Sequence, residues 1–451
     1  MSTAVEVMRR ELAVIVGTSR VVSDPIACAA LSVDGKSPQC IVYPASAEEV
    51  AATLRRAAEL GLGVIPCRNG TKLGVGNPPR RYDAALSLKD MNRVWHYEPD
   101  DLTVTAEPGM KFGDFQHFVG RHGLWLPLDP PGGARASLGG IVATNATGPL
   151  RLRYGAPRDM VLGMKIATVE GKVVKAGGRV VKNVAGYDIA KLLIGSHGTL
   201  GVIVETSFKL FPLPAERATF VMTAGTLGIA RDLRRRILHS PLTPLRMVLL
   251  DARAAGLTVA GTPLERPVKE PEIWLEVAGS PRVMERCHRE LADFAKAAGT
   301  PLRRLASEDA ETVWARIADL QSWLPRRSSG VVILRALLPD AASEELLSRA
   351  EQEAENEKAL LAGFAQLGVG VLHFCLLADA ATPAVLGLIR RLRGAAESLR
   401  GVLIIERCHW DIKDRVDAWG SPGDDFAVMK KIKETWDPKG TLSPGRFPGG
   451  L

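Results

Sequence analysis

The sequence predicts an α+β protein with two domains, the second of which carries an antiparallel sheet. Three observations support this prediction: a strand–helix–strand unit near the N-terminus, three loops of small residues between positions 66 and 201, and an alternation of strands and helices from 216 to 400. A chain of 451 residues is long enough for two or three domains. Its 46% hydrophobic and 24% charged residues are typical of globular proteins.

The first part of the chain predicts parallel strands. Residues 1 to about 35 are expected to form a helical lead-in, followed by a short apolar strand at 40–44. Ser46 and Glu49 have the spacing of a capping box, which begins a helix that Gly61 is well placed to end. A second strand follows at 64–66. This order favours a βαβ unit with a parallel pair of strands.

The hydrophobic pattern continues through the rest of the chain with alternating elements. In the first half we expect strands at 84–88, 102–106 and 202–205, a hairpin of 160–169 with 172–175, and helices at 112–122 and 189–194. In the second half we expect strands at 218–223, 273–277, 331–337, 369–376 and 402–405, and helices at 230–238, 281–298, 342–366, 383–399 and 424–436. Pro212 and Pro214 indicate a boundary near 215. The expected divisions are 1–35, 36–215, 216–400 and 401–451.

The charge pattern argues against a nucleic-acid-binding protein. The net charge is +8 and the isoelectric point is near 9.2, but the basic residues are mixed with acidic ones. No basic stripe interleaved with aromatic residues is present. The modest positive charge instead suits attraction of a small anionic substrate or an acidic partner protein.

Cysteine usage and hydropathy predict a cytoplasmic protein. None of the six cysteines forms a C-x-x-C pair, so we expect neither an iron–sulfur cluster nor a structural zinc in this chain. Scattered thiols also fit a reducing compartment. The N-terminal apolar run is too short for a signal peptide, and no window approaches the roughly 18 apolar residues of a membrane span.

The three loops of small residues are the strongest functional signal. In the central one, 137–148, every residue apart from Leu138, Ile141 and Val142 is small or carries a hydroxyl or amide. Glycine allows close approach of a ligand to the backbone, and free N–H groups in such a loop form an anion site. The loop at 66–76 adds Arg68 and Lys72, which can offset phosphate charge, and the third loop spans 195–201. Tight turns between buried elements are the alternative interpretation.

In their order and spacing, these loops resemble the FAD-binding domain of the vanillyl-alcohol oxidase family, over residues 36–215. The resemblance implies a two-part FAD-binding domain, a second domain over the substrate, and a C-terminal segment that returns to the flavin. It places the FAD pyrophosphate in the first two loops and the adenine near Val202 and Ile203. The ending Ser443-Pro444-Gly445-Arg446 approximates the family pattern N-P-G-[KR]. The cofactor-binding residues expected from the resemblance are Arg68, Asn69, Gly70, Thr71, Lys72, Pro131, Ala136, Ser137, Gly139, Gly140, Thr144, Asn145, Gly148, Val202, Ile203, Ser443 and Arg446.

Within that family, the runs 182–188, 195–201 and 437–446 are most similar to FAD-binding E subunits of glycolate oxidases. This similarity implies oxidation of glycolate or another 2-hydroxy acid, in a complex with a D-like flavoprotein subunit and an iron–sulfur subunit. The H-x-G-D-G-N-x-H metal motif of the D subunit is missing, so no metal site is expected. Lys72 lies about where some members carry a flavin-linked histidine, so we expect non-covalent FAD. His197 and Ser443 replace the Glu and Asn of many relatives.

Oxidation of a 2-hydroxy acid requires a cation for the carboxylate and a base for the hydroxyl proton. Our candidates for these roles are Arg407, His409 and Lys182, with Tyr187 as a wall or hydrogen-bond donor. Alternatively, residues 406–409 merely follow a strand, Lys182 and Tyr187 only brace the flavin loop, and His373 is a core histidine. A different class of function also stays open, namely a flavin-carrying structural or electron-transfer subunit without its own substrate site.

Overall fold

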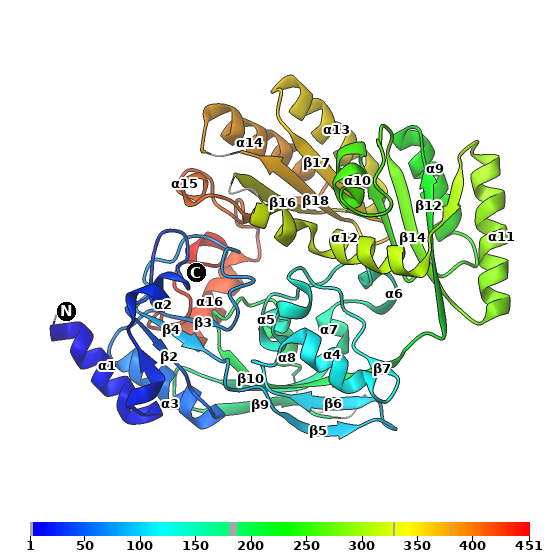
Figure 1. Ribbon diagram of the computed structural model, residues 1–451. Coiled ribbons are helices and arrows are strands. Elements are labelled where there is room, and N and C mark those ends of the chain that lie inside the picture. The colour runs from blue at the N-terminus through cyan, green and yellow to red at the C-terminus, as the bar shows by residue number, and fades with distance from the viewer. Residues whose placement is uncertain (1–2, 180–186, 328–329, 379) are drawn as a thin grey trace.

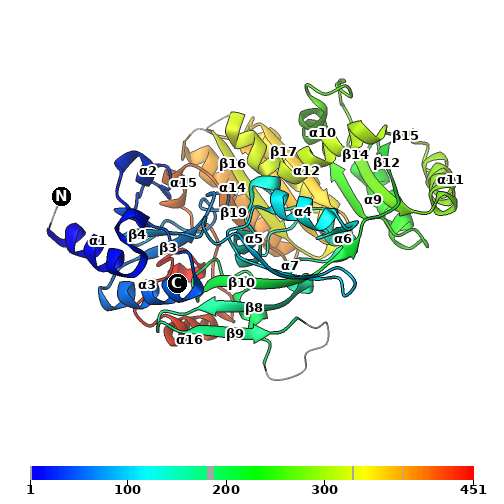
Figure 2. The same ribbon diagram turned by 60° about the horizontal axis from the view of Figure 1, so that its bottom comes forward.

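The protein consists of two lobes, one above the other in Figure 1. This computed structural model describes residues 3–179, 187–327, 330–378 and 380–451. The lower lobe contains the first half of the chain and its C-terminal end, and the upper lobe contains the residues between (Figures 1 and 2). The predicted α+β class with antiparallel sheets is confirmed.

The first sheet of the lower lobe is built from four short strands. Their order is β1 (Val21–Val22), β2 (Cys40–Val42), β4 (Ala84–Ser87) and β3 (Val64–Cys67), and β4 pairs in parallel with both β2 and β3. The strands that flank α3 (Ala47–Glu59) are therefore parallel, but they do not pair with each other, because β4 lies between them. The lead-in forms α1 (Thr3–Val16), a 3-10 turn at Thr18–Arg20 and α2 (Pro25–Ala29).

The start of α3 follows the capping signal only in part. The Ser46 hydroxyl accepts from the N–H of Glu49 at 3.1 Å, as the pattern predicts. The Glu49 carboxylate accepts from the N–H of Ala45 rather than that of Ser46, and it also pairs with Arg20 at 2.6 Å. The cap thereby also anchors the lead-in.

The second sheet of the lower lobe is antiparallel throughout. Its order is β5 (Val94–Glu98), β6 (Thr103–Ala106), β10 (Val202–Lys209), β8 (Val161–Ala167) and β9 (Val173–Gly177). The β8–β9 hairpin is confirmed, with Gly171 at φ 83° in its turn. Helices α1 and α3 share a core with both sheets, whereas α4 (Phe112–Gly120) and α5 (Leu138–Ala143) pack on the second sheet alone. The shorter elements are η2 (Gly133–Arg135), α6 (Arg151–Tyr154), α7 (Pro157–Met160), α8 (Ala190–Leu193), β7 (Leu124–Trp125) and β11 (Phe211–Pro212).

The upper lobe is an eight-stranded sheet in which every neighbouring pair is antiparallel. Its order is β15 (Leu302–Arg304), β12 (Glu216–Thr223), β14 (Glu272–Gly279), β13 (Arg246–Leu250), β17 (Leu361–Gln366), β18 (Val371–Leu377), β16 (Val331–Leu337) and β19 (Val402–Arg407). One face carries α9 (Leu227–Leu238), α11 (Pro281–Ala297), α13 (Ser343–Asn356) and α14 (Pro383–Ser398). The other face, toward the lower lobe, carries α10 (Ala252–Val259) and α12 (Ser307–Arg327) (Figure 1).

The predicted helix at 342–366 is wrong at its C-terminal end. Helix α13 stops at Asn356, and Lys358 takes a left-handed conformation with φ 53°. Residues 361–366 then form β17, buried between β13 and β18. The local composition, rich in alanine and leucine, favours a helix, but pairing in the middle of the sheet overrides that preference.

The C-terminal segment returns to the lower lobe. After α15 (Trp410–Lys413), α16 (Phe426–Trp436) packs beside the second sheet, and residues 441–443 run along β3 (Figures 1 and 2). The N–H of Val64 donates to Thr441 O at 2.7 Å, and the N–H of Ser443 donates to Val64 O at 2.9 Å. A 3-10 turn at Pro448–Gly450 follows. Over the described residues, no helix is long and apolar enough to span a bilayer.

Candidate functional site

The three loops of small residues meet around one cavity, which we call the cofactor cavity. It contains roughly 850 Å³ of space including its open mouth, within the range of small-molecule sites. Thirteen of the predicted cofactor-binding residues line it: Arg68, Asn69, Gly70, Thr71, Lys72, Ser137, Gly139, Gly140, Thr144, Val202, Ile203, Ser443 and Arg446. Loops from three separate parts of the chain therefore converge, as the sequence predicts.

Four predicted residues lie outside this cavity. Pro131 and Asn145 line a second cavity, described below. Ala136 and Gly148 line neither cavity. The Ala136 carbonyl accepts from Phe112 N at 2.8 Å, and a Cβ added to Gly148 would lie 2.2 Å from the carbonyl oxygen of Asp129. Gly148 therefore allows close packing against Asp129, and the Ala136 carbonyl holds the first residue of α4.

The first loop presents a row of free amides. Among the described residues, no hydrogen bond is donated by the backbone N–H groups of Asn69, Gly70, Thr71 and Lys72. The loop is closed by hydrogen bonds from Leu73 N to Gly70 O and from Val75 N to Lys72 O, and Gly70 adopts φ 70°. Successive unpaired N–H groups on a fixed turn form an anion-binding concavity.

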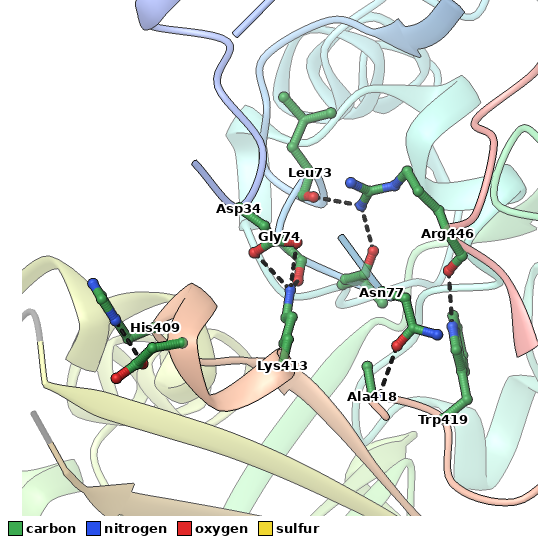
Figure 3. Close-up of polar contacts among 11 residues, drawn as sticks. Asp34, Leu73, Gly74, Asn77, His409, Lys413, Ala418, Trp419 and Arg446 are labelled. Carbon is green, nitrogen blue, oxygen red and sulfur yellow. Dashed lines mark hydrogen bonds and ion pairs between the residues drawn. The ribbon is translucent and has the colours of Figure 1, made fainter. Parts of the chain in front are cut away.

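The C-terminal segment holds this loop from outside (Figure 3). The Arg446 guanidinium donates to the carbonyl oxygens of Leu73 and Val75, and the Lys413 ammonium donates to Gly74 O at 2.7 Å. Trp419 Nε1 donates to Arg446 O at 2.8 Å. Arg446 therefore borders the cavity, but the hydrogen bonds of its guanidinium position the loop.

The central loop is held by its own side chains and by the upper lobe. The Ser137 hydroxyl accepts from Gly140 N at 3.3 Å, which caps α5. A Cβ added to Gly139 would lie 2.6 Å from Pro108 Cβ, so this glycine allows close packing. Asp319, on α12, accepts from Gly132 N at 2.7 Å. The upper lobe thereby fixes the entrance to the central loop.

A second cavity, the cap cavity, lies against the first one at the contact between the lobes. It contains roughly 770 Å³ including its open mouth, and it shares Lys72, Val75, Thr144 and His197 with the cofactor cavity. The upper lobe contributes Arg335, Leu337, Val371, His373 and Glu406. Arg151 joins them from α6 in the lower lobe.

An ion pair and a buried imidazole define the upper wall of the cap cavity. Arg335 Nη1 lies 3.0 Å from Glu406 Oε1, and His373 Nε2 lies 3.9 Å from Glu406 Oε2. The His373 ring stacks on Phe364 with centroids 4.8 Å apart. Burial raises the pKa of Glu406, but Arg335, His373 and Lys72 outweigh it and hold that pKa below the usual value.

Both histidines of the cap cavity are neutral at pH 7. Burial lowers the pKa of His373 to about 4. Burial also lowers the pKa of His197 to about 3, and the positive charges of Arg335 and Arg446 lower it further. His197 packs edge-on against Trp419 and has φ 53°. A neutral imidazole has a ring nitrogen that can accept a proton. Burial and the nearby cations make both histidines weak bases, and among the described residues only the Glu406 carboxylate acts in the opposite direction.

Strand pairing explains how these side chains meet. Arg335 and His373 are direct neighbours across β16 and β18, so their side chains emerge on the same face. On β19, Ile405 pairs with Leu334 and Arg407 pairs with Ile333, which leaves Glu406 as the extra residue of a bulge. A bulge re-aims a side chain relative to the regular alternation.

The predicted catalytic residues are not brought together. Arg407 is exposed at the end of β19, and neither it nor His409 lines the cofactor cavity or the cap cavity. His409 Nδ1 lies 2.6 Å from Asp411 Oδ1, apart from the residues that hold the first loop (Figure 3). Tyr187 is 96% exposed and lines neither cavity. Lys182 lies outside the described residues.

The sequence interpretation missed Arg335, Glu406 and Arg151, and weighed His373 chiefly as a core residue. The sequence did carry a signal for Arg335 and His373, because both interrupt otherwise apolar strands. A charged or titratable residue in the middle of a buried strand requires a partner or a function. In the described part of the chain, no group of three or more His, Cys, Asp or Glu residues is arranged to hold a metal.

Two family models match the chain. The model of the FAD binding domain matches residues 38–177, and that of the FAD linked oxidases, C-terminal domain, matches residues 213–406 and 419–447. The chain belongs to the FAD-linked oxidases. Its cofactor is FAD, as the sequence predicts.

Curated relatives of this FAD-linked oxidase include two hydroxy-acid enzymes. It is 28% identical to the mitochondrial D-lactate dehydrogenase [cytochrome] of Arabidopsis thaliana, over 91% of this chain and 73% of that protein. It is 24% identical to glycolate oxidase subunit GlcD of Bacillus subtilis, over 91% of this chain and 89% of that protein. Among solved structures, 4-ethylphenol oxidase from Gulosibacter chungangensis aligns over 100% of this chain and 98% of its own, with a TM-score of 0.78 and 17% identity. That structural similarity shows the vanillyl-alcohol oxidase type of fold.

The cofactor cavity of this FAD-linked oxidase fits FAD in the chemistry of its lining. The free amides of residues 69–72 and the nearby Arg68 suit a diphosphate. Gly70 and Gly140 leave room for a ligand against the backbone. Apolar groups that suit an aromatic ring system also line the cavity, among them Ile65, Val202 and Ile203.

Proposed function

We propose that this FAD-linked oxidase oxidises glycolate or another 2-hydroxy acid to the 2-oxo acid, as the E-type subunit of a larger complex. The observation that carries the proposal is the cap cavity, which is rich in cations and shares Lys72 and His197 with the cofactor cavity. A small acid in the cap cavity lies next to the cofactor. The named activities of the D-lactate dehydrogenase and glycolate oxidase relatives support the same substrate class.

In this proposal, residues 36–215 bind FAD, 216–400 form the cap domain, and 401–451 complete the cofactor cavity, with 1–35 as a lead-in. The amides of residues 69–72, together with Arg68 and the central loop, hold the pyrophosphate. Val202 and Ile203 contact the adenine end. Ser443 takes the place that Asn has in many relatives; it keeps a left-handed backbone, with φ 46°, beside the cavity.

The cap cavity supplies the groups that the reaction requires from the protein. Arg335 is placed to bind the substrate carboxylate in a charge-assisted hydrogen bond. The neutral His373 imidazole takes the hydroxyl proton, and the Glu406 carboxylate next to it stabilises the resulting imidazolium. FAD, when bound, supplies the acceptor for the hydrogen and electron pair that leave C2. The products are the 2-oxo acid, a proton on His373 and the reduced cofactor.

Partner subunits would then carry the electrons onward. A D-like flavoprotein and an iron–sulfur subunit are the partners that we propose, because this chain has no cluster motif of its own. We place the complex in the cytoplasm. All six cysteines are free thiols, which supports a reducing compartment.

The rival function is a flavin-carrying or electron-transfer subunit with no substrate site of its own. The decisive experiment is to purify the chain alone with FAD and to add glycolate or D-lactate without oxygen. We expect the flavin absorbance near 450 nm, roughly where oxidised flavins absorb, to bleach within the dead time of manual mixing or shortly after. A flavin that stays oxidised until a D-like partner is added would contradict the proposal and support the rival function.

A further inference from the structure

Arg151 is a cation in the cap cavity that the proposed reaction does not use. Its half-buried side chain lines the cavity from α6. Among the described residues, its guanidinium has no hydrogen bond and no ion pair. Asp159, the carboxylate whose charge acts on Arg151, accepts from the N–H of Ala156 at 2.8 Å.

The position of Arg151 is fixed by packing on both sides of α6. Leu152 packs against the core of the upper lobe. Tyr154 stacks edge-on against Trp125 and Phe211 in the lower lobe. The N–H of Leu150 donates to Asp129 at 3.1 Å. These contacts of residues 150, 152 and 154 fix the backbone at Arg151, whose side chain lines the cavity.

The lining of the cap cavity has an excess of positive charge. Three cations, Lys72, Arg151 and Arg335, face one carboxylate, Glu406, and the two histidines are neutral. Only the Arg335 guanidinium among these cations has a carboxylate partner within the described residues. The Lys72 ammonium has none, and Asp319, which acts on it electrostatically, accepts from Gly132 N. Burial lowers the pKa of Lys72, which also borders the cofactor cavity. With a single substrate carboxylate bound at Arg335, Arg151 therefore stays without a counter-ion.

We propose that the cap cavity is built for a 2-hydroxy acid with a second carboxylate, and that Arg151 is the residue that selects it. This inference rests on the proposed function and deepens it. Removing a guanidinium from water without a partner is unfavourable, so an anion that reaches Arg151 gains a strong interaction. Burial and the charge of Arg335 lower the pKa of Arg151, which is the electrostatic signature of an unpaired cation. A monocarboxylate bound at Arg335 makes no use of Arg151.

Binding of non-oxidisable anions tests the inference without turnover. The FAD-loaded chain is titrated by calorimetry with malonate, succinate and glutarate, each compared with the monocarboxylate of equal carbon number. We expect the dissociation constant of at least one dicarboxylate to be lower than that of its monocarboxylate partner by about tenfold or more. This is the gain expected from one added hydrogen bond to a charged group. Arg151→Met is expected to remove that preference, and Arg151→Lys is expected to retain part of it.

Arg153 offers a matched control, because it lies two residues further along the same helix, is exposed and lines neither cavity. Arg153→Met is expected to keep the preference for dicarboxylates. The inference is overturned if no dicarboxylate binds more tightly to the unmodified protein, or if Arg151→Met leaves the preference intact.

In a parallel assay, D-malate and D-lactate are compared as reductants of the flavin. If D-lactate reduces the flavin as well as D-malate does, the role of Arg151 is contradicted but the proposed oxidation is not. If neither acid reduces the flavin although dicarboxylates still bind, the proposed oxidation is contradicted.

Discussion

The Lys413 ammonium group lies 2.9 Å from each carboxylate oxygen of Asp34, a residue 379 positions earlier in the chain (Figure 3). The Lys413 side chain is fully buried, and its third hydrogen bond goes to Gly74 O in the first loop. This buried ion pair joins the lead-in, the cofactor loop and the segment after the upper lobe. The first loop, which lines the cofactor cavity, is therefore held by two residues that do not line it.

Replacement of Lys413 by Met should destabilise the protein strongly. The substitution leaves the Asp34 carboxylate buried without a partner. We therefore expect the free energy of unfolding to fall by about 3–5 kcal/mol. Urea denaturation measures this loss, and FAD fluorescence in the filtrate measures cofactor release. The double variant Asp34→Asn with Lys413→Met should recover part of the stability. A loss below about 1 kcal/mol in the single variant would show that the pair is not important for folding.

A side chain at position 140 should block the cofactor. Gly140 lines the cofactor cavity, and an added Cβ would approach only the Ser137 hydroxyl, at 3.1 Å. Gly140→Val is therefore expected to fold and to purify without flavin. The flavin content is measured as the ratio of the absorbance near 450 nm, roughly the flavin band, to that near 280 nm, roughly the protein band. Gly120→Val is a suitable control, because an added Cβ there meets no atom within 4 Å. Normal flavin content in Gly140→Val would refute the placement of FAD against the central loop.

The bulge on β19 predicts opposite results for two adjacent residues. Glu406→Gln should slow flavin reduction by a 2-hydroxy acid on the order of 100-fold, because the carboxylate no longer stabilises a proton on His373. Arg407→Gln, one residue along the strand and exposed, should change the rate by less than about threefold. Stopped-flow reduction of the FAD-loaded chain compares the two. The reverse order of effects would restore Arg407 as the catalytic candidate.

The half-buried His197, which lines both cavities, predicts acid sensitivity. The pKa of His197 is about 3 in the folded protein, against an ordinary value of 6.5 for a free imidazole. Between these values the unfolded chain binds more protons than the folded one, so the stability rises with pH through this window and falls on acidification. From pH 7 to pH 5, His197 should contribute a loss of about 2 kcal/mol.

His197→Asn is the variant that isolates this effect, because asparagine tolerates the positive φ of this position. The variant should lose less stability than the unmodified protein between pH 7 and pH 5, as measured by the urea midpoint at each pH. Equal losses in the two proteins would mean that His197 already binds a proton in the folded state.

The cofactor cavity was predictable from sequence because its signals are local. Each of its three loops is a contiguous run of small residues, and the family pattern fixes their order. Gly70 and Gly140 are therefore identified before the fold is known, and the structure places both at the cavity. The second domain with an antiparallel sheet was also predicted, although β13, β15 and β17 were not.

The cap cavity was not predictable in this way, because its residues come together only through tertiary contacts. Residues 402–405 form an uninterrupted apolar run, which carries no alternation from which to decide whether Glu406 or Arg407 faces inward. The bulge that decides it depends on pairing with β16. Arg151 is an ordinary basic residue in the sequence until the contact between the lobes places it opposite Arg335 in the same cavity.

The return of the chain end to β3 has a consequence for biosynthesis. The edge of the cofactor cavity is formed by Ser443 and Arg446, and the first loop is held by Lys413. A ribosome that has synthesised only the first 215 residues has therefore produced all three glycine loops without the groups that lock them in place. Tight binding of FAD is therefore expected only after residues 413–446 have been synthesised and have folded back onto the first loop.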